Sequence, residues 1–527
     1  MIDFLDPKHV VVRDLLERNA IETPNEPFML FEDGSTWTSL QCLNEAAAAA
    51  NELLAAGVTR GSAVAVALPN GPDFLRAFWG TAMIGAAMVP VNPTYRGSLI
   101  SHMLHLSRPV AVVTEGEFRK RLLDAVPNGE FALLDPSELR STNRIPPALE
   151  RPIEPWDAVC LAMTSGTTGP SKLVRVAYAQ CLQGGTSTFN LWGRSEADVY
   201  LMDTPAFHMG AIYIISSSLF SRNKIALRKR PDLVNYWEIV RDTGATMSQI
   251  YGTMVNFLEG QPYRAAERQH SLRLALTIPL PADPEEFRKR FGIEHVLSGW
   301  GSTEVGCPIN KAPGFATTTG SIGRVLPGYQ VRLVDENDKE VPVGVPGEAV
   351  LRADIPWLIS TEYVGNPVAT CEVWRNGWFH TGDLLKRDVE GNFYFIDRLK
   401  DSLRRRGQNI SSYEVEVVVL AFHGVTEAAA VPERTSVEAE DEVKVWVVTE
   451  NGIDIDFREL LVFCLERLPH HMVPRFFERA AELPKTPSAK IQKHLLRERG
   501  NGPDTWDRVA NGLEVTRHGL QELKQVS

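Results

Sequence analysis

The sequence predicts an α/β fold with a large N-terminal part and a smaller α+β part at the C-terminal end. Residues 1–150 alternate helix-like and strand-like segments, which is typical of parallel sheets with crossover helices. Residues 330–396 instead contain two hairpin patterns, and the composition changes again beyond residue 400. With 527 residues, the chain is too long for one compact core, so we expect more than one domain.

The N-terminal alternation can be followed segment by segment. An Ala-rich stretch at 43–56 predicts a helix that ends at Gly57, and the short-side-chain run 63–67 predicts a buried strand. A second helix is expected at 73–85, followed by an apolar run at 86–91. The same pattern returns through 199–227 and 234–258, so parallel strands with crossover helices are expected there too.

The hairpins are indicated by strand-like runs around polar turns. Residues 331–334 and 347–351 flank a polar turn at 335–339. A second turn, Glu390-Gly391-Asn392, precedes an apolar run at 393–396. This part of the chain is therefore expected to be antiparallel.

The change in composition places a domain boundary near Lys400. Beyond it, a strand is expected at 443–449 and a helix at 457–468. The prediction is an N-terminal domain of residues 1–399 and a C-terminal domain of residues 400–527.

The composition excludes several classes of protein. Hydrophobic residues make up 44% and charged residues 23%, which is typical of a soluble globular chain. A net charge of −11 without a long basic block argues against nucleic-acid binding. Six scattered cysteines without a CxxC pair argue against a disulfide framework or a zinc knuckle. We see neither a signal peptide nor an apolar 20-mer, and so expect a cytoplasmic protein without a membrane span.

One loop has the composition of a phosphate cradle, because it offers many hydrogen-bond donors after an expected strand at 158–162. Its glycines allow a tight turn that presents backbone N–H groups. The loop ends at Lys172, and its other candidate residues are Thr164, Ser165, Gly166, Thr167, Thr168 and Gly169. It is not a Walker A loop, since Ser171 stands where glycine is needed and Leu173 where a hydroxyl is needed.

Four further motifs follow the loop in order: Gly299–Glu304, Trp378–Asp383, Asp397–Lys400 followed by Arg406–Ile410, and Pro484–Lys490. With these motifs, the sequence resembles the adenylate-forming superfamily of acyl- and aryl-CoA synthetases, adenylation domains and beetle luciferases. Within the superfamily, Leu276–Pro279, the pair Asp397-Arg398 and the run Arg406–Ser411 look most like the carnitine/crotonobetaine-CoA ligase branch.

The resemblance implies a fold and a reaction. The large domain should contain stacked α/β sheets and a distorted β-barrel, and the small α+β domain should be a mobile lid that pivots at Lys400. The expected activity is that of an ATP-dependent acyl-CoA synthetase. A carboxylic acid reacts with MgATP to give an acyl-adenylate and pyrophosphate, and coenzyme A then takes the acyl group and releases AMP.

The resemblance also implies roles for the polyphosphate contacts. The cradle at 164–169 and Lys172 would hold the β- and γ-phosphates, and Thr303 would contact the α-phosphate. Glu304 would bind Mg²⁺, which prefers carboxylate oxygens and water. Lys490 would bridge the carboxylate and the α-phosphate, and such fixed cationic groups stabilise the negative charge of the transition state.

Other motif residues would contact the nucleoside and coenzyme A. Trp300 would stack on adenine, while Asp383 and Arg398 would hold the ribose. After rotation of the lid, Gly407 and Gln408 would line the pantetheine tunnel. Taken alone, Glu304 could equally be a carboxylate at a helix N-terminus and Asp383 a turn former.

The sequence gives fewer indications of the acyl site. His208 is expected beside it, although a buried histidine with a backbone partner is an equal alternative. Side chains at 276–278 replace the small residues usual in the family and should narrow the site or alter adenine packing. The candidate pocket residues are Phe207, His208, Tyr251, Gly252, Leu276 and Ile278.

Several alternatives stay open at this stage. The acceptor could be a carrier-protein phosphopantetheine, or departures such as Leu173, Arg406 and Ala489 could mark a homologue that has lost catalysis. A hydrolase is excluded because no G-x-S-x-G motif occurs. The sequence does not decide which acid is used, the oligomeric state, or whether Arg404–Arg406 contact coenzyme A phosphates or form a solvated face.

Overall fold

The computed structural model describes most of the chain, and for residues 252, 253, 403–405, 408, 409, 414 and 451 the backbone alone. The described residues are 2–164, 171–278, 280–281, 283–313, 320–399, 403–405, 408–410, 412–433, 442–468, 470, 472–485, 491–516 and 519–522.

The first sheet of the N-terminal part has six strands in the order β6-β5-β3-β4-β7-β8, all parallel except β8. The strands are β3 (Ala63–Ala67), β4 (Ala87–Pro90), β5 (Ala111–Thr114), β6 (Ala132–Leu134), β7 (Ala158–Met163) and β8 (Leu173–Ala177), and the crossover helices are α4 (Pro72–Met83), α5 (Ser98–Ser107) and α6 (Gly116–Ala125). Helix α4 confirms the helix predicted at 73–85, whereas α5 and α6 were not predicted individually.

The second sheet has seven strands in the order β13-β12-β11-β9-β10-β1-β2. All neighbours are parallel except β2, which is antiparallel to β1. The strands are β1 (Pro27–Phe31), β2 (Thr36–Thr38), β9 (Val199–Met202), β10 (Lys224–Leu227), β11 (Met247–Tyr251), β12 (Leu274–Ile278) and β13 (His295–Leu297). The crossover helices are α8 (Met209–Ser221), α9 (Tyr236–Thr243), α10 (Gly252–Gly260) and α11 (Pro284–Phe291).

The strand order of this second sheet reverses at β9. The chain passes from β9 to β10 on one side and then returns to β11 on the other side of β9. Helix α8 packs into the core shared by both sheets, whereas α9, α10 and α11 pack into a separate core on the opposite face. Ligands of open α/β sheets bind at the carboxyl ends of strands where the order reverses, so the ends of β9 and β11 mark a binding position.

Local sequence explains the start of helix α3 and its close packing against α4. Helix α3 (Ser39–Ala55) begins earlier than predicted, because Thr38 and Gln41 form a reciprocal capping box. Its alanines then let α4 approach so closely that a Cβ on Gly80 would lie 2.6 Å from the Cβ of Ala49. The remaining helices here are α1 (Pro7–Val10), α2 (Val12–Glu22) and α7 (Tyr178–Thr186), with 3₁₀ turns at Pro136–Leu139, Phe189–Trp192 and Ala265–Arg268.

Antiparallel strands follow the second parallel sheet, and they confirm both predicted hairpins. One sheet contains β14 (Gly299–Ser302), β15 (Gly306–Asn310) and β16 (Arg324–Val325). The other contains β17 (Tyr329–Val334), β18 (Gly347–Ala353), β19 (Trp374–Arg375), β20 (Trp378–Arg387) and β21 (Phe393–Arg398). Helix α12 (Pro367–Val373) lies between β18 and β19 in the chain. The two sheets share one hydrophobic core.

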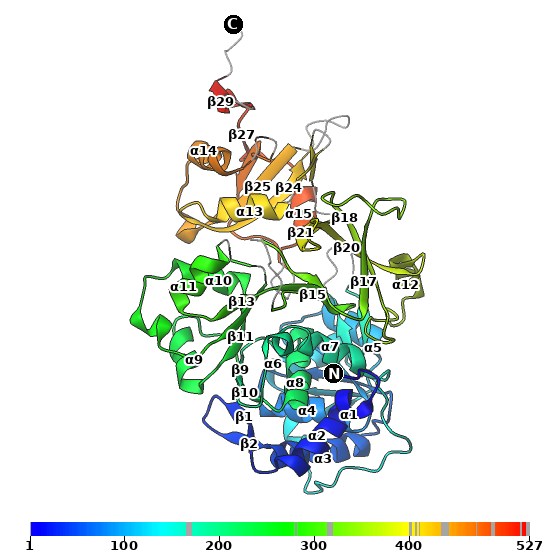
Figure 1. The fold of residues 1–527 in the computed structure, drawn as a ribbon. Coiled ribbons are helices and arrows are strands. Elements are labelled where there is room, and N and C mark those ends of the chain that lie inside the picture. Colours follow the sequence, from blue (N-terminus) through cyan, green and yellow to red (C-terminus); the bar gives the residue numbers. More distant parts are fainter. Residues whose placement is uncertain are drawn as a thin grey trace.

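The C-terminal part lies at the opposite end of the molecule from β1, β2 and α3 (Figure 1). Its main hydrophobic core is formed from residues between Ile410 and Leu520. The strands are β22 (Leu403–Arg405), β23 (Gln408–Ile410), β24 (Val425–Glu433), β25 (Glu442–Thr449), β26 (Phe476–Arg479), β27 (Trp506–Asp507), β28 (Leu513–Thr516) and β29 (Gly519–Glu522). The helices are α13 (Ser412–Leu420), α14 (Phe457–Arg467) and α15 (Lys493–Arg499), with a 3₁₀ turn at Glu450–Gly452.

The predicted fold class is confirmed, with a large α/β part and a small α+β part that has its own core. Lys400, the predicted boundary, lies outside the described residues. Within the residues that are described, no helix combines the length and apolar character needed to cross a membrane.

Candidate active site

The phosphate-cradle loop is closed at its base by an antiparallel strand pair. Strand β7 confirms the predicted strand before the loop, and its last residue, Met163, pairs with Leu173 of β8. One step further, the Thr164 amide donates to the Lys172 carbonyl oxygen at 2.9 Å. Both ends of the loop are therefore fixed. Residues 165–170, which carry the predicted contacts of Ser165, Gly166, Thr167, Thr168 and Gly169, lie outside the described residues.

Lys172 lies over an aromatic ring that sequence reasoning missed. Its Nζ is 4.6 Å from the centroid of the Tyr363 ring. The segment around Tyr363 continues the sheet beside β8, since the Val364 amide donates to the Leu173 carbonyl at 2.7 Å. Tyr363 is only 7% exposed, so the contact is largely shielded from water and the attraction between cation and ring is correspondingly strong.

The same tyrosine contacts the predicted magnesium ligand. The Tyr363 hydroxyl donates to Oε1 of Glu304 at 3.0 Å. Burial raises the pKa of Tyr363, and the charge of Glu304 raises it further, so the hydroxyl remains a proton donor. Glu304 lies in the turn between β14 and β15, which makes the alternative interpretation as a carboxylate at a helix N-terminus wrong.

Three other predicted residues are in direct contact. The indole Nε1 of Trp300 donates to Oδ2 of Asp383 at 2.9 Å, and Arg398 Nε pairs with Oδ1 of Asp383 at 2.8 Å. Asp383 and Arg398 face each other in the register of β20 and β21. Asp383 is buried, whereas the Arg398 side chain is 41% exposed. Trp300 lies in β14 and Glu304 in the turn directly after it, so the two contact groups are close together.

The backbone around Thr303 is held by a close strand approach. The Thr303 carbonyl accepts from Nε2 of the buried Gln180 at 2.8 Å. A Cβ on Gly301 would lie 2.0 Å from the Gly306 carbonyl oxygen, so only glycine fits there. The turn that bears Thr303 and Glu304 is thus fixed from both sides.

His208 belongs to a different part of the structure, at the reversal point of the second sheet. It is the residue just before α8, and its ring lies 4.5 Å from that of Phe207. A Cβ on Gly210 would lie 3.8 Å from the Tyr251 hydroxyl, so the start of α8 approaches the end of β11. Burial raises the pKa of Tyr251 to about 12, which keeps this hydroxyl neutral.

The three side chains of residues 276–278 lie in different environments. Ile278 is 40% exposed and ends β12 beside Tyr251, whereas Leu276 is 8% exposed and packs into the core between the sheets. Thr277 is buried on the other face, and its hydroxyl donates to the Leu297 carbonyl at 3.2 Å. Of the three side chains, Ile278 is the one that is exposed.

The Asn70 amide joins the ends of both sheets near His208. Its Nδ2 donates to the carbonyls of Thr204 at 2.9 Å and Arg228 at 3.0 Å, and its Oδ1 accepts from the Ala206 amide at 2.6 Å. The turn from β9 to His208 is thereby anchored to the loop after β3.

Other predicted site residues cannot be located in this way. Lys400, Arg406, Gly407 and Lys490 lie outside the described residues, and only the backbone of Gln408 is described, in β23.

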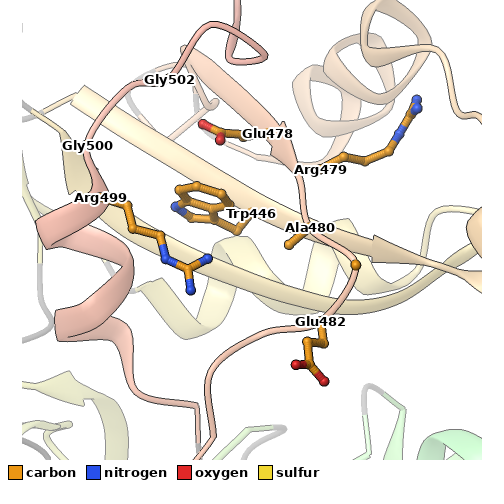
Figure 2. Close-up of a pocket in the computed structure, with 9 residues that line it drawn as sticks. Trp446, Glu478, Arg479, Ala480, Glu482, Arg499, Gly500 and Gly502 are labelled. Carbon is orange, nitrogen blue, oxygen red and sulfur yellow. The ribbon is translucent and has the colours of Figure 1, made fainter.

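A cavity of about 450 Å³ lies elsewhere, in the C-terminal part (Figure 2). Trp446 of β25 lies at its centre, and Arg499 of α15 lies 5.8 Å from the indole centroid. Its other lining residues are Glu478, Arg479, Ala480, Ala481, Glu482, Gly500 and Gly502. None of these is a predicted site residue, so this cavity is separate from the cluster around Tyr363 and Asp383.

Comparison with known proteins agrees with this arrangement. The model for AMP-binding enzymes matches residues 16–358, and the model for the AMP-binding enzyme C-terminal domain matches residues 414–490. A crotonobetaine/carnitine–CoA ligase of Citrobacter koseri is 32% identical over 473 residues, which cover 85% of this chain and 90% of the relative. One from Escherichia coli O1:K1 is 29% identical over 470 residues, with the same coverage.

Solved structures show the same fold. The o-succinylbenzoate coenzyme A synthetase of Bacillus subtilis in complex with AMP has a TM-score of 0.82 and 25% identity, covering 93% of this chain and 98% of that one. An anthranilate CoA ligase in complex with anthranoyl-AMP has a TM-score of 0.82 and 22% identity, covering 94% and 98%. The predicted resemblance, fold and enzyme class, an acid–thiol ligase, are confirmed. This chain belongs to the family of AMP-binding enzymes.

Proposed function

We propose that this chain is an ATP-dependent acyl-CoA synthetase that uses the residues around Tyr363 and Asp383 to bind MgATP. In the first step, a carboxylate oxygen attacks the α-phosphorus, and the bond to the leaving pyrophosphate breaks. In the second step, the sulfur of coenzyme A attacks the acyl carbonyl, and AMP leaves with the oxygen that joined it to the acyl group.

One observation carries this proposal: four motifs that are distant in the sequence meet in one place. Lys172 and Glu304 contact the same tyrosine, and Trp300, Asp383 and Arg398 form a second contact group beside it. This supports the proposal, because Lys172 and Arg398 are cations suited to a polyphosphate, Glu304 is a carboxylate suited to a metal ion, and Asp383 can accept hydrogen bonds from ribose hydroxyls. If each of these residues had only a separate structural role, there would be no reason for them to lie together.

The residues fit a magnesium ion. Among the described residues, no group of three or more histidine, cysteine or acidic side chains could hold a metal by itself. Mg²⁺ in nucleotide enzymes is typically bound by one or two carboxylates together with water and phosphate oxygens. Glu304 supplies one carboxylate, and its Oε1 is oriented by Tyr363. When bound, the ion would neutralise charge on the phosphate oxygens.

We assign the remaining predicted roles on the basis of family membership. The lid would comprise residues 400–527, with a pivot at Lys400, adenylation by Lys490, and a pantetheine tunnel lined by Gly407 and Gln408. The separate core of the C-terminal part supports this assignment, because a unit with its own core can rotate without unfolding. The six free cysteines fit a reducing compartment such as the cytoplasm.

The acid would enter at the reversal point of the second sheet, between His208, Tyr251 and Ile278. This position is supported by the strand order and by the partial exposure of Ile278.

The test is a screen of carboxylic acids with the purified chain, ATP, Mg²⁺ and coenzyme A. The library should include crotonobetaine and carnitine, the acids named for the relatives. Acid-dependent pyrophosphate release together with a CoA thioester supports the proposal. Pyrophosphate release with transfer only to a carrier-protein phosphopantetheine would favour that alternative acceptor. If none of the acids gives pyrophosphate release, a homologue that has lost catalysis is favoured.

A further inference from the structure

Tyr363 contacts both Lys172 and Glu304. Its ring lies 4.6 Å from Lys172 Nζ, and its hydroxyl lies 3.0 Å from Glu304 Oε1. These two residues come from different sheets, since Lys172 precedes β8 and Glu304 follows β14. The tyrosine therefore joins the base of the phosphate loop to the predicted metal ligand.

The backbone fixes the position of this tyrosine. Tyr363 forms an antiparallel bridge with Val174 of β8, and its amide donates to Oγ1 of Thr370 at 3.0 Å. The side chain is 7% exposed, so it has little freedom to adopt another orientation. Whatever it contacts is consequently held at a defined place.

We propose that Tyr363 is a positioning residue that orients Lys172 and Glu304 for MgATP. This inference rests on the proposed function. The hydroxyl holds Oε1 of Glu304 and thereby turns the carboxylate, so that its other oxygen can meet the metal ion. The ring holds the ammonium group of Lys172 beside the mouth of the phosphate loop, which lowers the conformational entropy lost when the lysine meets a phosphate.

The two contacts can be removed one at a time. Tyr363→Phe deletes only the hydrogen bond to Glu304 and keeps the ring under Lys172. Tyr363→Leu deletes both. If the proposal is right, the first substitution weakens the metal-dependent part of binding alone, and the second weakens the metal-independent part as well.

The measurement is the affinity for α,β-methylene ATP, which cannot form the adenylate, determined by calorimetry with Mg²⁺ and with EDTA. For Tyr363→Phe we expect about a tenfold loss of affinity with Mg²⁺, as for a lost hydrogen bond to a charged group, and no change with EDTA. For Tyr363→Leu we expect the same loss with Mg²⁺ and an additional loss of several-fold under both conditions.

The chain offers a matched control in Tyr394. Its hydroxyl donates to Oδ2 of Asp388 at 2.9 Å, and Lys386 Nζ lies 5.5 Å from its ring. Like Tyr363, Tyr394 contacts one carboxylate and one lysine, but neither Asp388 nor Lys386 is a predicted site residue. Tyr394→Phe and Tyr394→Leu should leave both affinities unchanged.

Two further variants separate this inference from the proposed function. If Lys172→Ala and Glu304→Gln weaken binding of the MgATP analogue while both Tyr363 variants bind like wild type, the positioning role is wrong and the proposed function stands. If Lys172→Ala and Glu304→Gln also bind like wild type, the assignment of the ATP site is wrong. Should Tyr363→Leu fail to fold, the magnesium dependence of Tyr363→Phe alone decides the matter.

Discussion

Trp300 donates a hydrogen bond to Asp383 across 83 residues of sequence, and both side chains are almost completely buried. The contact links β14 to β20, and Arg398 of β21 completes it from the partly exposed side. A buried carboxylate that accepts one hydrogen bond and forms one ion pair has a restricted orientation, which is what recognition of ribose hydroxyls requires.

Removing the carboxylate should therefore affect both nucleotide binding and stability. In Asp383→Ala, the Trp300 N–H loses its acceptor, and an unsatisfied buried donor costs about 1–3 kcal/mol. We expect the KM for ATP to rise at least tenfold, with a lower thermal midpoint. Asp383→Asn keeps an acceptor for Trp300 but loses the charge, and should retain most of the stability while ATP binding stays weak. Steady-state kinetics and thermal unfolding check this, and unchanged ATP kinetics in both variants would contradict the ribose assignment.

Lys490 is expected to serve adenylation only. Lys490→Ala should reduce acid-dependent pyrophosphate release by about a hundredfold or more, since one preorganised charge in a transition state is worth ~3 kcal/mol. Thioester formation from a supplied acyl-adenylate should survive. Equal losses in both half-reactions would disprove the role.

Lys400 is expected to be the pivot. Proline fixes φ near −65° and should hinder rotation of the lid in Lys400→Pro. The variant should still release pyrophosphate but convert the adenylate to thioester more slowly. If both half-reactions keep their wild-type rates in single-turnover assays, the pivot lies elsewhere.

The contrast between Ile278 and Leu276 gives a prediction about the acid site. Ile278→Ala removes a 40% exposed side chain at the end of β12 and should admit bulkier acids, with little change in stability. Leu276→Ala creates a cavity in the core and should cost about 2–4 kcal/mol. Comparing kcat/KM across a series of acids with urea unfolding separates the two effects. An acid profile that Ile278→Ala leaves unaltered would remove this residue from the acyl site.

Asp203 predicts a pH dependence of stability. Burial raises the pKa of its carboxyl from 3.8 to about 7. The folded state then binds the proton more tightly than the unfolded state, so the free energy of unfolding falls as pH rises between these two values. Asp203→Asn stays neutral at every pH and should lack this loss. The thermal midpoint of wild type should therefore drop by a few degrees relative to the variant from pH 5 to pH 8, and parallel curves would show that Asp203 does not titrate in this range.

Much of the fold was predictable because its signals are local. The strand at 63–67 and the hairpin turn at 390–392 were found from alternation and turn residues alone. The start of α3 is set by the reciprocal cap between Thr38 and Gln41, which the Ala-rich pattern at 43–56 does not reveal.

The candidate site was predictable only in part. Charged residues such as Lys172, Glu304 and Arg398 stood out because they lie in recognisable motifs. Tyr363 did not, since an aromatic residue between two strands is most often core. Its role depends on pairing between its segment and β8, which only the folded chain shows. Likewise, which side chains of β12 are buried depends on how the neighbouring helices cover the two faces of the sheet, and here Leu276 is buried while Ile278 is exposed.

The hydrogen bonds of Asn70 have an evolutionary consequence. All three reach main-chain atoms, the carbonyls of Thr204 and Arg228 and the amide of Ala206. The path of the turn before His208 is therefore anchored independently of the side chains that the turn carries. Substitutions in this turn can change the surface offered to an acid while the backbone keeps its course, so a lineage of such enzymes could diversify its substrates without rebuilding the scaffold.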